Sequence, residues 1–496
     1  MRIRRHPAAA GAPSGPGAVR RILHPLRAAT AGSPSRFAVL VFTGIIFLWT
    51  ALLMLPISAA DGAPTPFHAA LFTAVSTICV TGLSIVDMGT HWSLFGNVVI
   101  FIGLEVGAIG VLTLASIMGA IVTRRLGLRQ RLMAASDQNA MRIHAGPVAE
   151  SQAIRLGDIG GMLVTVAVSL LVVEVLMALV IIPRFLLAGY GFWESIADGF
   201  YLAASAFTNT GFTPNAEGLA PFAGDVWLLG ALAVAVFLGS LGFPVIFAIA
   251  RQAGTLPGRL TSRRDRVHRG PARVSVHVRL TLATTVLLFG LGTVALYLLE
   301  MDNPGTFGRF EAWAQPLHAA FLSVMARSGG FAVIDVSQVE PATMLALDAL
   351  MFIGGGSAST AGGIKVTTFA ILLLAAVAEA KGVQDIQAFG RRIPTDVLRL
   401  AVAIAIWGAT IVVVSSILLM HLTGAPFSLA LFDSISAFAT CGLSTGLTAQ
   451  LPPEGTYVLS ATMWLGRVGT VTMAAALASS ERKQLFRLPE ERVIVG

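Results

Sequence analysis

One eight-residue stretch occurs twice in this sequence, as Ser205-Ala206-Phe207-Thr208-Asn209-Thr210-Gly211-Phe212 and, almost unchanged, as Ser436-Ala437-Phe438-Ala439-Thr440-Cys441-Gly442-Leu443. Two looser copies run from Phe72 to Leu83 and from Phe321 to Phe331. Each copy is typical of a short helix that breaks at a small residue, followed by glycine and a large apolar residue. The repetition indicates one structural unit used four times.

Long apolar segments on both sides predict that these stretches are pore loops. An unpaired amide in lipid costs several kcal/mol, so non-helical backbone at membrane depth is expected only where protein buries it or a watery cavity faces it. Glycine permits backbone angles that turn carbonyl oxygens toward one axis, and carbonyl rings replace the water shell of a cation. The predicted filter takes three residues from each copy: Val80, Thr81 and Gly82; Asn209, Thr210 and Gly211; Ser328, Gly329 and Gly330; Thr440, Cys441 and Gly442.

The composition predicts an all-α polytopic membrane protein. It is 55% hydrophobic and 12% charged over 496 residues, which is implausible for a soluble core. We expect four repeats of helix, pore loop and helix (M1-P-M2) in a pseudo-fourfold arrangement. Eight segments are long enough to span roughly 30 Å of hydrocarbon: 37–57, 94–120, 159–183, 225–250, 280–299, 343–378, 400–422 and 456–480.

The predicted organisation places tails outside four repeats. The repeats cover 37–120, 158–250, 280–378 and 400–480, and residues 481–496 form a cytoplasmic tail. Residues 1–36 hold seven arginines and no acidic residue. They predict a disordered cytoplasmic tail rather than a signal peptide, because the following apolar run exceeds an h-region and lacks a clean cleavage pattern.

Charge predicts the orientation. Of the 34 Lys and Arg residues, 29 fall in five segments, whereas the other loops are mainly acidic. The five segments are 1–36, 119–157, 251–279, 379–399 and 481–496. The positive-inside rule then places both termini in the cytoplasm, in agreement with an even number of spans. Juxtamembrane arginines normally meet anionic lipid headgroups or an acidic partner, so nucleic acid is not expected as a partner.

The third repeat predicts a gate. Other second spans carry a Gly-x-x-Gly step, as in 239–242 and 466–469, but this repeat has a glycine-rich run from Gly354 to Lys365. Each glycine in a helix costs about 1 kcal/mol relative to alanine, so the run (354–363) should interrupt the helix, obstruct the pore and move. A phosphate-binding P-loop is disfavoured, because Ile364 separates the glycines from the lysine. The predicted gate residues are Gly354, Gly355, Gly356, Gly362, Gly363, Lys365 and Arg467.

Remaining buried polar residues have alternative interpretations. Arg467 has five donors suited to loop carbonyls or filter oxygens, or else pairs with Glu105 or Glu174. Arg327 is expected to brace the filter backbone, since a cation in the ion path would repel the ion.

The two cysteines, Cys79 and Cys441, indicate small buried side chains rather than disulfide or redox chemistry. An enzyme is not expected, because no His or Cys spacing supplies an acid-base pair or metal cluster.

Together these residues resemble the Trk/Ktr/HKT superfamily of potassium transporters, and within it the KtrB-type membrane subunits. The resemblance covers nearly everything after Arg36. Its most specific parts are the filter motifs, the run from Gly354 to Val366, the step Gly466-Arg467-Val468-Gly469 and the ending 489–496. Two departures are Glu105, where glutamine is common, and Gly329, where alanine is usual.

The resemblance implies a bacterial-type inner-membrane homodimer above a ring of KtrA-like cytosolic subunits that bind ATP, ADP or NAD. It also implies that the third-repeat loop gates the pore, with Arg467 against it. We expect a potassium uptake channel or transporter, in contact with lipid, that binds no cofactor and uses Na⁺, if at all, as a coupling or activating ion. The alternative is a sodium-conducting or cotransporting member. Sodium-selective relatives typically carry serine at the first filter glycine, so Gly82 favours potassium.

Overall fold

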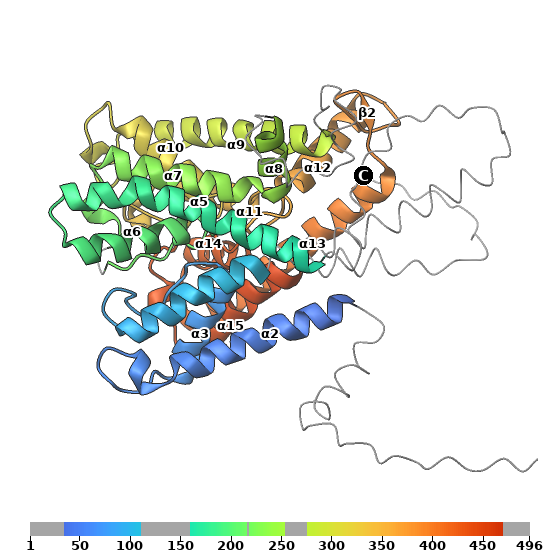
Figure 1. Ribbon diagram of the computed structural model, residues 1–496. Coiled ribbons are helices and arrows are strands. Elements are labelled where there is room, and N and C mark those ends of the chain that lie inside the picture. Colours follow the sequence, from blue (N-terminus) through green and yellow to red (C-terminus); the bar gives the residue numbers. More distant parts are fainter. Residues whose placement is uncertain (1–33, 111–158, 216–217, 253–274, 470–496) are drawn as a thin grey trace, which may run out of the picture.

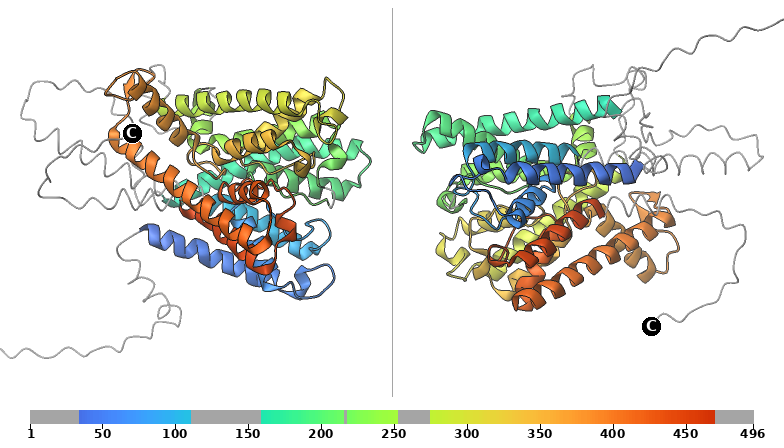
Figure 2. Two further views of the ribbon diagram at one scale, coloured as in Figure 1. Left: turned by 180° about the vertical axis from the view of Figure 1, so that it is seen from behind. Right: turned by 90° about the horizontal axis from the view of Figure 1, so that it is seen from below.

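The protein is helical, as expected. The computed structural model describes residues 34–110, 159–215, 218–252 and 275–469. Long helices lie side by side across it (Figures 1 and 2). Strand structure within these ranges is limited to a small hairpin of β1 (Gln387–Ala388) and β2 (Arg391–Arg392). The predicted tails, 1–36 and 481–496, lie wholly or almost wholly outside the described residues.

Helices of three kinds follow one another along the chain. The long apolar helices are α2 (Pro34–Leu53), α5 (Ile159–Leu187), α9 (Val276–Glu300) and α13 (Thr395–Thr423). Each precedes a short helix: α3 (Phe67–Ile78), α6 (Phe192–Phe207), α10 (Gln315–Met325) or α14 (Phe427–Phe438). The helices that come next are Leu94–Gly110, α7 (Val226–Leu241), α11 (Pro341–Phe352) and α15 (Pro453–Trp464). Single 3₁₀ turns lie in the loops at Pro56–Ser58 (η1), Ala220–Phe222 (η3), Phe307–Arg309 (η4), Val336–Gln338 (η5) and Thr448–Gln450 (η6).

The second helices are interrupted. Helix α7 meets α8 (Phe243–Gln252) at a bend of 104°. The expectation of one continuous span over 225–250 is therefore wrong. Gly242 adopts φ +90°, which a helix does not tolerate, and Pro244 cannot donate a backbone hydrogen bond. The predicted break in the third repeat is present, between α11 and α12 (Val366–Ala380). Helix α15 continues into a π-helical turn, η7 (Leu465–Gly469).

These breaks keep many helices short. Within the described ranges, three helices are long and apolar enough to cross a membrane: Ala167–Leu187, Val276–Glu300 and Thr395–Thr423. The bent pair of α7 and α8 would make a fourth. The shorter apolar helical stretches have 10–17 residues, and they include Val39–Leu53 of α2. The count of eight spans therefore stays a prediction.

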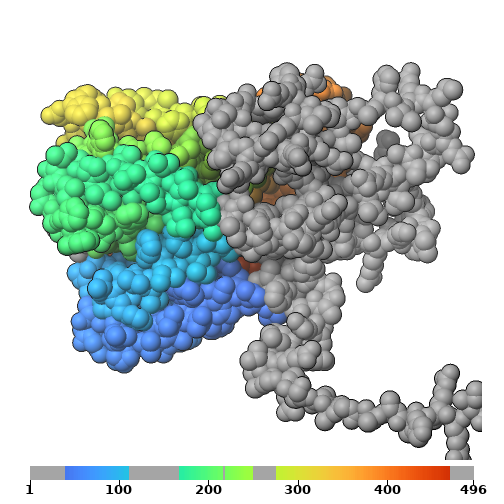
Figure 3. Space-filling model, viewed as in Figure 1, coloured from blue at the N-terminus to red at the C-terminus, as the bar shows by residue number. Residues whose placement is uncertain are grey.

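The helices succeed one another around a common axis. On the face shown in Figure 3, early, middle and later segments lie in sequence order from bottom to top, and the view from behind in Figure 2 shows the last ones. Helix α10 contacts α7, α14 contacts α11, and α3 contacts α15, so the end of the chain closes on its beginning. Helices α2, α5, α9 and α13 all begin toward the right-hand side of Figure 1.

Burial is inverted relative to a soluble protein. The short helices are the most buried elements, and α3 is enclosed from Phe72 to Ile78. The long helices instead expose large apolar side chains, such as Leu179 (63%), Leu291 (60%) and Ile417 (59%). Extended apolar surface of this kind marks contact with a membrane or a partner. The outer faces of α5, α9 and α13 are therefore suited to lipid.

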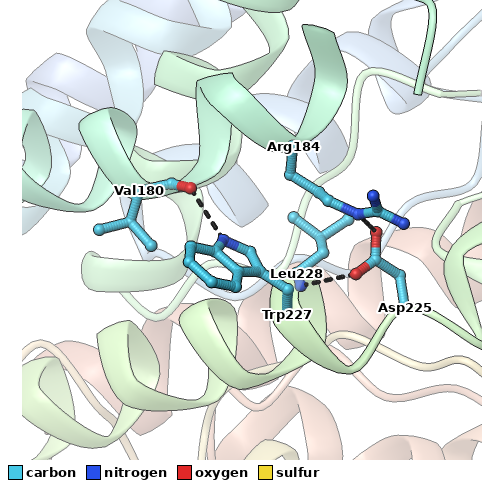
Figure 4. Close-up of polar contacts among 5 residues, drawn as sticks. All are labelled: Val180, Arg184, Asp225, Trp227 and Leu228. Atoms are coloured by element: carbon cyan, nitrogen blue, oxygen red, sulfur yellow. Dashed lines mark hydrogen bonds and ion pairs between the residues drawn. The ribbon is translucent and has the colours of Figure 1, made fainter. Parts of the chain in front are cut away.

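Polar contacts join α5 to α7 near the loop end of both helices (Figure 4). Arg184 forms an ion pair with Asp225. Asp225 also caps α7, because its Oδ1 accepts a hydrogen bond from the Leu228 backbone N–H at 3.1 Å. The indole N–H of Trp227 donates to the Val180 carbonyl at 3.0 Å. One aspartate thus serves both a helix cap and a contact between helices.

Substitutions of Asp225 separate these two roles. Asp225→Ala loses the cap, worth about 0.5–2 kcal/mol, and the half-exposed ion pair, worth about 0–1 kcal/mol. Asp225→Asn keeps a cap oxygen and loses only the charge. Thermal unfolding in detergent should therefore rank parent, Asn and Ala in order of falling Tm, with the larger step from Asn to Ala. Equal Tm values for Ala and parent would contradict the capping role.

Candidate functional site

Each predicted filter segment leaves its short helix through the same unusual backbone. The residue two positions before each glycine is left-handed: Val80 (φ 56°), Asn209 (61°), Ser328 (77°) and Thr440 (46°). The glycines follow with φ of 89° at Gly82, 85° at Gly211, 74° at Gly330 and 99° at Gly442. Non-glycine residues avoid this conformation, which costs roughly 1–3 kcal/mol and persists only where the surroundings enforce it. Four equivalent outliers make these segments the candidate functional site.

The four segments meet in a closed ring. A Cβ added to Gly82 would overlap the Thr210 carbonyl oxygen. At Gly211 it would lie 2.8 Å from the Gly329 oxygen, at Gly330 2.6 Å from the Cys441 oxygen, and at Gly442 2.5 Å from the Thr81 oxygen. Each glycine therefore faces the carbonyl that precedes the next glycine, and the fourth faces the first. The structure brings all four predicted filter segments together.

Serines hold three of these segments. Backbone N–H groups of Thr81, Thr210 and Cys441 each donate at 2.8 Å to the carbonyl of a serine near the end of the short helix. Those serines are Ser76, Ser205 and Ser436. The hydroxyls of Ser76 and Ser436 also accept from the N–H groups of Gly82 and Gly442, at 3.1 and 3.2 Å, and Ser205 donates to the Phe212 carbonyl at 2.7 Å. The sequence analysis missed these serines, although each stands six residues before a filter glycine.

Glycines in the second helices allow close approach to the filter. A Cβ at Gly107, Gly239 or Gly466 would overlap the last carbonyl of a short helix, that of Ile78, Phe207 or Phe438 respectively. The recurrent glycine of these helices thus has a steric reason. Gly329 is similarly enclosed, since a Cβ there would lie 2.7 Å from both Met325 Sδ and Val236 Cγ1.

The glycine-rich run of the third repeat is docked against the bend of α7. The Gly356 N–H donates to the Ser240 carbonyl at 2.7 Å, and the Phe243 N–H donates to the Ala358 carbonyl at 3.1 Å. Most of the run is buried. Backbone hydrogen bonds and burial therefore hold this segment in place. The break in α7 leaves backbone groups without partners inside the helix, and backbone groups of the glycine-rich run provide those partners.

The same run contacts the filter itself. Thr360 Oγ1 lies 2.9 Å from Asn209 Oδ1 and 3.1 Å from the Gly239 carbonyl. The Gly362 N–H donates to Ser328 Oγ at 3.0 Å, and Ser328 Oγ donates to the Thr440 carbonyl at 2.8 Å. The predicted gate run, 354–363, and two predicted filter residues are therefore in direct contact.

The structure shows the hydrogen-bond partners of the buried Arg467 and Lys365 side chains, which the sequence did not decide. Arg467 lies in the π-helical turn, and its Nη1 makes a long contact of 3.4 Å to Thr440 Oγ1, a filter oxygen rather than a loop carbonyl. It forms no ion pair with Glu105 or Glu174 in the described part of the chain. Those two carboxyl groups lie close to each other. Lys365 Nζ donates to the Ala361 carbonyl of its own loop at 2.5 Å.

Arg327 braces a helix rather than the filter. Its Nη1 donates to the Thr285 carbonyl of α9 at 3.0 Å. The expectation of a direct bond to the filter backbone is wrong, because the side chain leaves the end of α10 toward α9. Cys79 and Cys441 are fully buried free thiols, as expected.

Asp433 is a further positioning residue that the sequence did not reveal. This buried carboxylate of α14 accepts from the backbone N–H groups of Thr445 and Thr448 at 3.0 and 2.9 Å, and from the hydroxyls of both threonines and of Ser444. It fixes the loop that follows the fourth filter segment. Such a network depends on tertiary packing and leaves no spacing signal.

Comparison with known proteins agrees with this geometry. The model of the TrkH family, described as cation transport protein, matches residues 26–487. The chain belongs to the TrkH family. Ktr system potassium uptake protein B of Vibrio alginolyticus is 32% identical over 465 residues, which cover 94% of this chain and 95% of that protein. Potassium/sodium uptake protein NtpJ of Enterococcus hirae is 29% identical over 491 residues, covering 96% and 98%.

A solved member supports the TrkH fold. The crystal structure of the potassium transporter TrkH from Vibrio parahaemolyticus matches with a TM-score of 0.66 and 19% identity, covering 89% of this chain and 83% of that one. At this identity the match establishes the fold alone. The family model and the 32% identity to the Vibrio alginolyticus protein confirm, at the level of the family, the resemblance drawn from the filter and loop motifs.

Two glycines of α7 test the close packing behind the filter. Gly239→Ala should destabilise the protein by about 1–3 kcal/mol, because its Cβ would overlap backbone and the short helix must move. Gly230→Ala, on the same helix with nothing within 4 Å of the added Cβ, should be neutral or stabilising. Thermal unfolding in detergent measures both. Equal effects of the two substitutions would contradict the packing described.

Proposed function

We propose that this chain is the membrane subunit of a potassium uptake system, and that K⁺ passes through the ring of four filter segments. The observation that carries the proposal is the cyclic contact of each filter glycine with the carbonyl of the next segment. Carbonyl oxygens held in this way by left-handed backbone can replace the hydration shell of a cation. The metal is cargo, and backbone carbonyls of the filter would hold it.

The proposed architecture is a pore of four M1-P-M2 repeats with eight crossings. Support comes from the cyclic contacts of α10 with α7, α14 with α11 and α3 with α15. Short or bent second helices fit this proposal, because their breaks are buried against other repeats rather than exposed to lipid. The four first helices begin at one end of the bundle, which supports both termini on the cytoplasmic side of the cell membrane.

Potassium is favoured over sodium as the cargo. Three of the similar proteins are named as potassium uptake proteins, and the last residue of each of the four filter segments here is glycine. The second candidate is sodium conduction or cotransport, favoured by the potassium/sodium name of the Enterococcus hirae relative. Flux through the reconstituted protein in liposomes, with K⁺, Rb⁺, Na⁺ and Li⁺ compared, tests the choice. Potassium and rubidium should exceed sodium and lithium; dominant sodium flux would support the second candidate, and no flux of any ion would contradict both.

Serine at the filter glycines should lower selectivity. Replacing Gly82, Gly211, Gly330 or Gly442 adds a Cβ that overlaps a carbonyl of the neighbouring segment at a backbone with positive φ. We expect the K⁺/Na⁺ permeability ratio to fall about tenfold or more, since a displacement worth 1.4 kcal/mol changes an equilibrium tenfold. Gly446→Ser is the control, because Gly446 has φ +89° but nothing within 4 Å. Unchanged ratios in all four filter variants would contradict the assignment.

The proposed gate is the run 354–363, under control of a cytosolic partner. The run lies between the filter and the bend of α7, and Arg467 contacts the filter residue Thr440 nearby. A homodimer and a ring of nucleotide-binding subunits would complete the system. Docking through the basic segments 124–155 and 259–279 is supported by their charge alone, since they lie outside the described residues or almost so.

Shortening the loop tests the gate. Deleting part of 354–363 should raise flux severalfold and weaken its dependence on the cytosolic partner, because the obstructing segment is gone. Arg467→Ala should also change the flux and its dependence on the partner, because it removes the contact to Thr440, but the protein should remain selective for K⁺. Liposome flux with and without the partner measures both effects. Flux and partner dependence equal to those of the parent protein would place the gate elsewhere.

A further inference from the structure

We propose that the loop 354–363 is a structural brace of the selectivity filter as well as an obstruction, so that release of the loop lowers ion selectivity at the same time as it opens the path. This inference rests on the proposed function of the filter. Its basis is the pair of contacts Thr360–Asn209 and Gly362–Ser328.

The contacts fall on the strained residues of the filter. Asn209 and Ser328 are two of the four non-glycine residues of the filter segments with positive φ. Such a conformation persists only when neighbouring groups enforce it. Asn209 is held on both sides, because its Nδ2 donates to the Val236 carbonyl at 3.2 Å and its Oδ1 accepts from Thr360. Ser328 is likewise held between Gly362 of the loop and the Thr440 carbonyl of the next filter segment.

Departure of the loop would remove one hydrogen-bond donor from each residue, Thr360 from Asn209 Oδ1 and Gly362 from Ser328 Oγ. With the loop in place, Asn209 is 0% exposed and Ser328 is 1% exposed, so these two oxygens rely on protein donors rather than on water. Buried polar atoms without partners are costly, and the backbone would relax to regain hydrogen bonds. Since Ser328 also bonds to Thr440, relaxation at one segment reaches its neighbour. The carbonyl ring then loses its spacing.

The first filter segment provides an internal contrast. Val80 occupies the corresponding left-handed position and has no polar atom in its side chain. It cannot form the hydrogen bond that Asn209 and Ser328 make to the loop. The coupling is therefore asymmetric: the loop forms hydrogen bonds with the second and third segments, and Gly362 also packs against Thr440 of the fourth. The asymmetry matches the origin of the loop in the third repeat and its docking on the bend of α7.

Thr360→Val is the first test, because it removes the donor hydroxyl with little change in volume. The reconstituted full-length protein should show raised K⁺ flux and a K⁺/Na⁺ permeability ratio lowered about two- to tenfold, the range expected for one buried hydrogen bond. Thr360→Ser, which keeps the hydroxyl, should recover most of the selectivity. Thr410→Val is the matched control: it removes a threonine hydroxyl that bonds to the Ile406 carbonyl of its own helix, α13, at 2.8 Å rather than to the filter, and the permeability ratio should stay at the parent value.

Ser328→Gly supplies a second test should Thr360→Val fail to fold. Glycine accommodates the φ of 77° and lacks the hydroxyl, so selectivity should fall without added backbone strain. Raised flux with unchanged selectivity, in either Thr360→Val or Ser328→Gly, would overturn the proposal and leave the loop as an obstruction only. Unchanged flux and selectivity in a folded variant would overturn it as well. Failure of the proposed function is distinct, because the parent protein itself would then show no potassium-selective flux.

Discussion

The structure depends on keeping four short chain segments in a backbone conformation that non-glycine residues avoid. Val80, Asn209, Ser328 and Thr440 are left-handed, and each leads to a glycine that faces a carbonyl of the next segment. No segment holds this backbone conformation by itself, because each contact in the ring joins residues of two different repeats. Serine carbonyls at the ends of short helices, small residues in the second helices and the third-repeat loop all act on this ring. The most buried part of the molecule is accordingly its polar centre.

The interrupted second helices follow from this constraint. In a continuous helix, the backbone N–H and C=O groups bond to one another and do not pair with a neighbouring segment. The break at Gly242 instead leaves a carbonyl and an N–H group that can bond to another segment. The glycine-rich run pairs with both, and then reaches Asn209 and Ser328. Two sequence breaks that each look unfavourable therefore stabilise each other at membrane depth, where unpaired backbone groups are costly.

Local features of the filter and of the glycine-rich run could be predicted from the sequence, but the contacts between distant residues could not. The glycine positions, the short helices and the interruption after Phe352 follow from residue types and their spacing. The bend at Gly242 was hidden in an apolar run, and its partner lies more than a hundred residues away. Arg327 turned toward α9 and Arg467 toward Thr440 because of packing that no spacing encodes. The serines before the filter were predictable, since Ser76, Ser205 and Ser436 recur at one distance from glycine.

Locating the bound ion is the most direct test of whether K⁺ binds inside the ring of filter carbonyls. A structure of the protein determined in Tl⁺ or Rb⁺ in place of K⁺ would locate the ion by its anomalous scattering. The account predicts a peak inside the ring, among the carbonyl oxygens of Thr81, Thr210, Gly329 and Cys441. A peak bound elsewhere, with none inside the ring of a protein that conducts potassium, would contradict it.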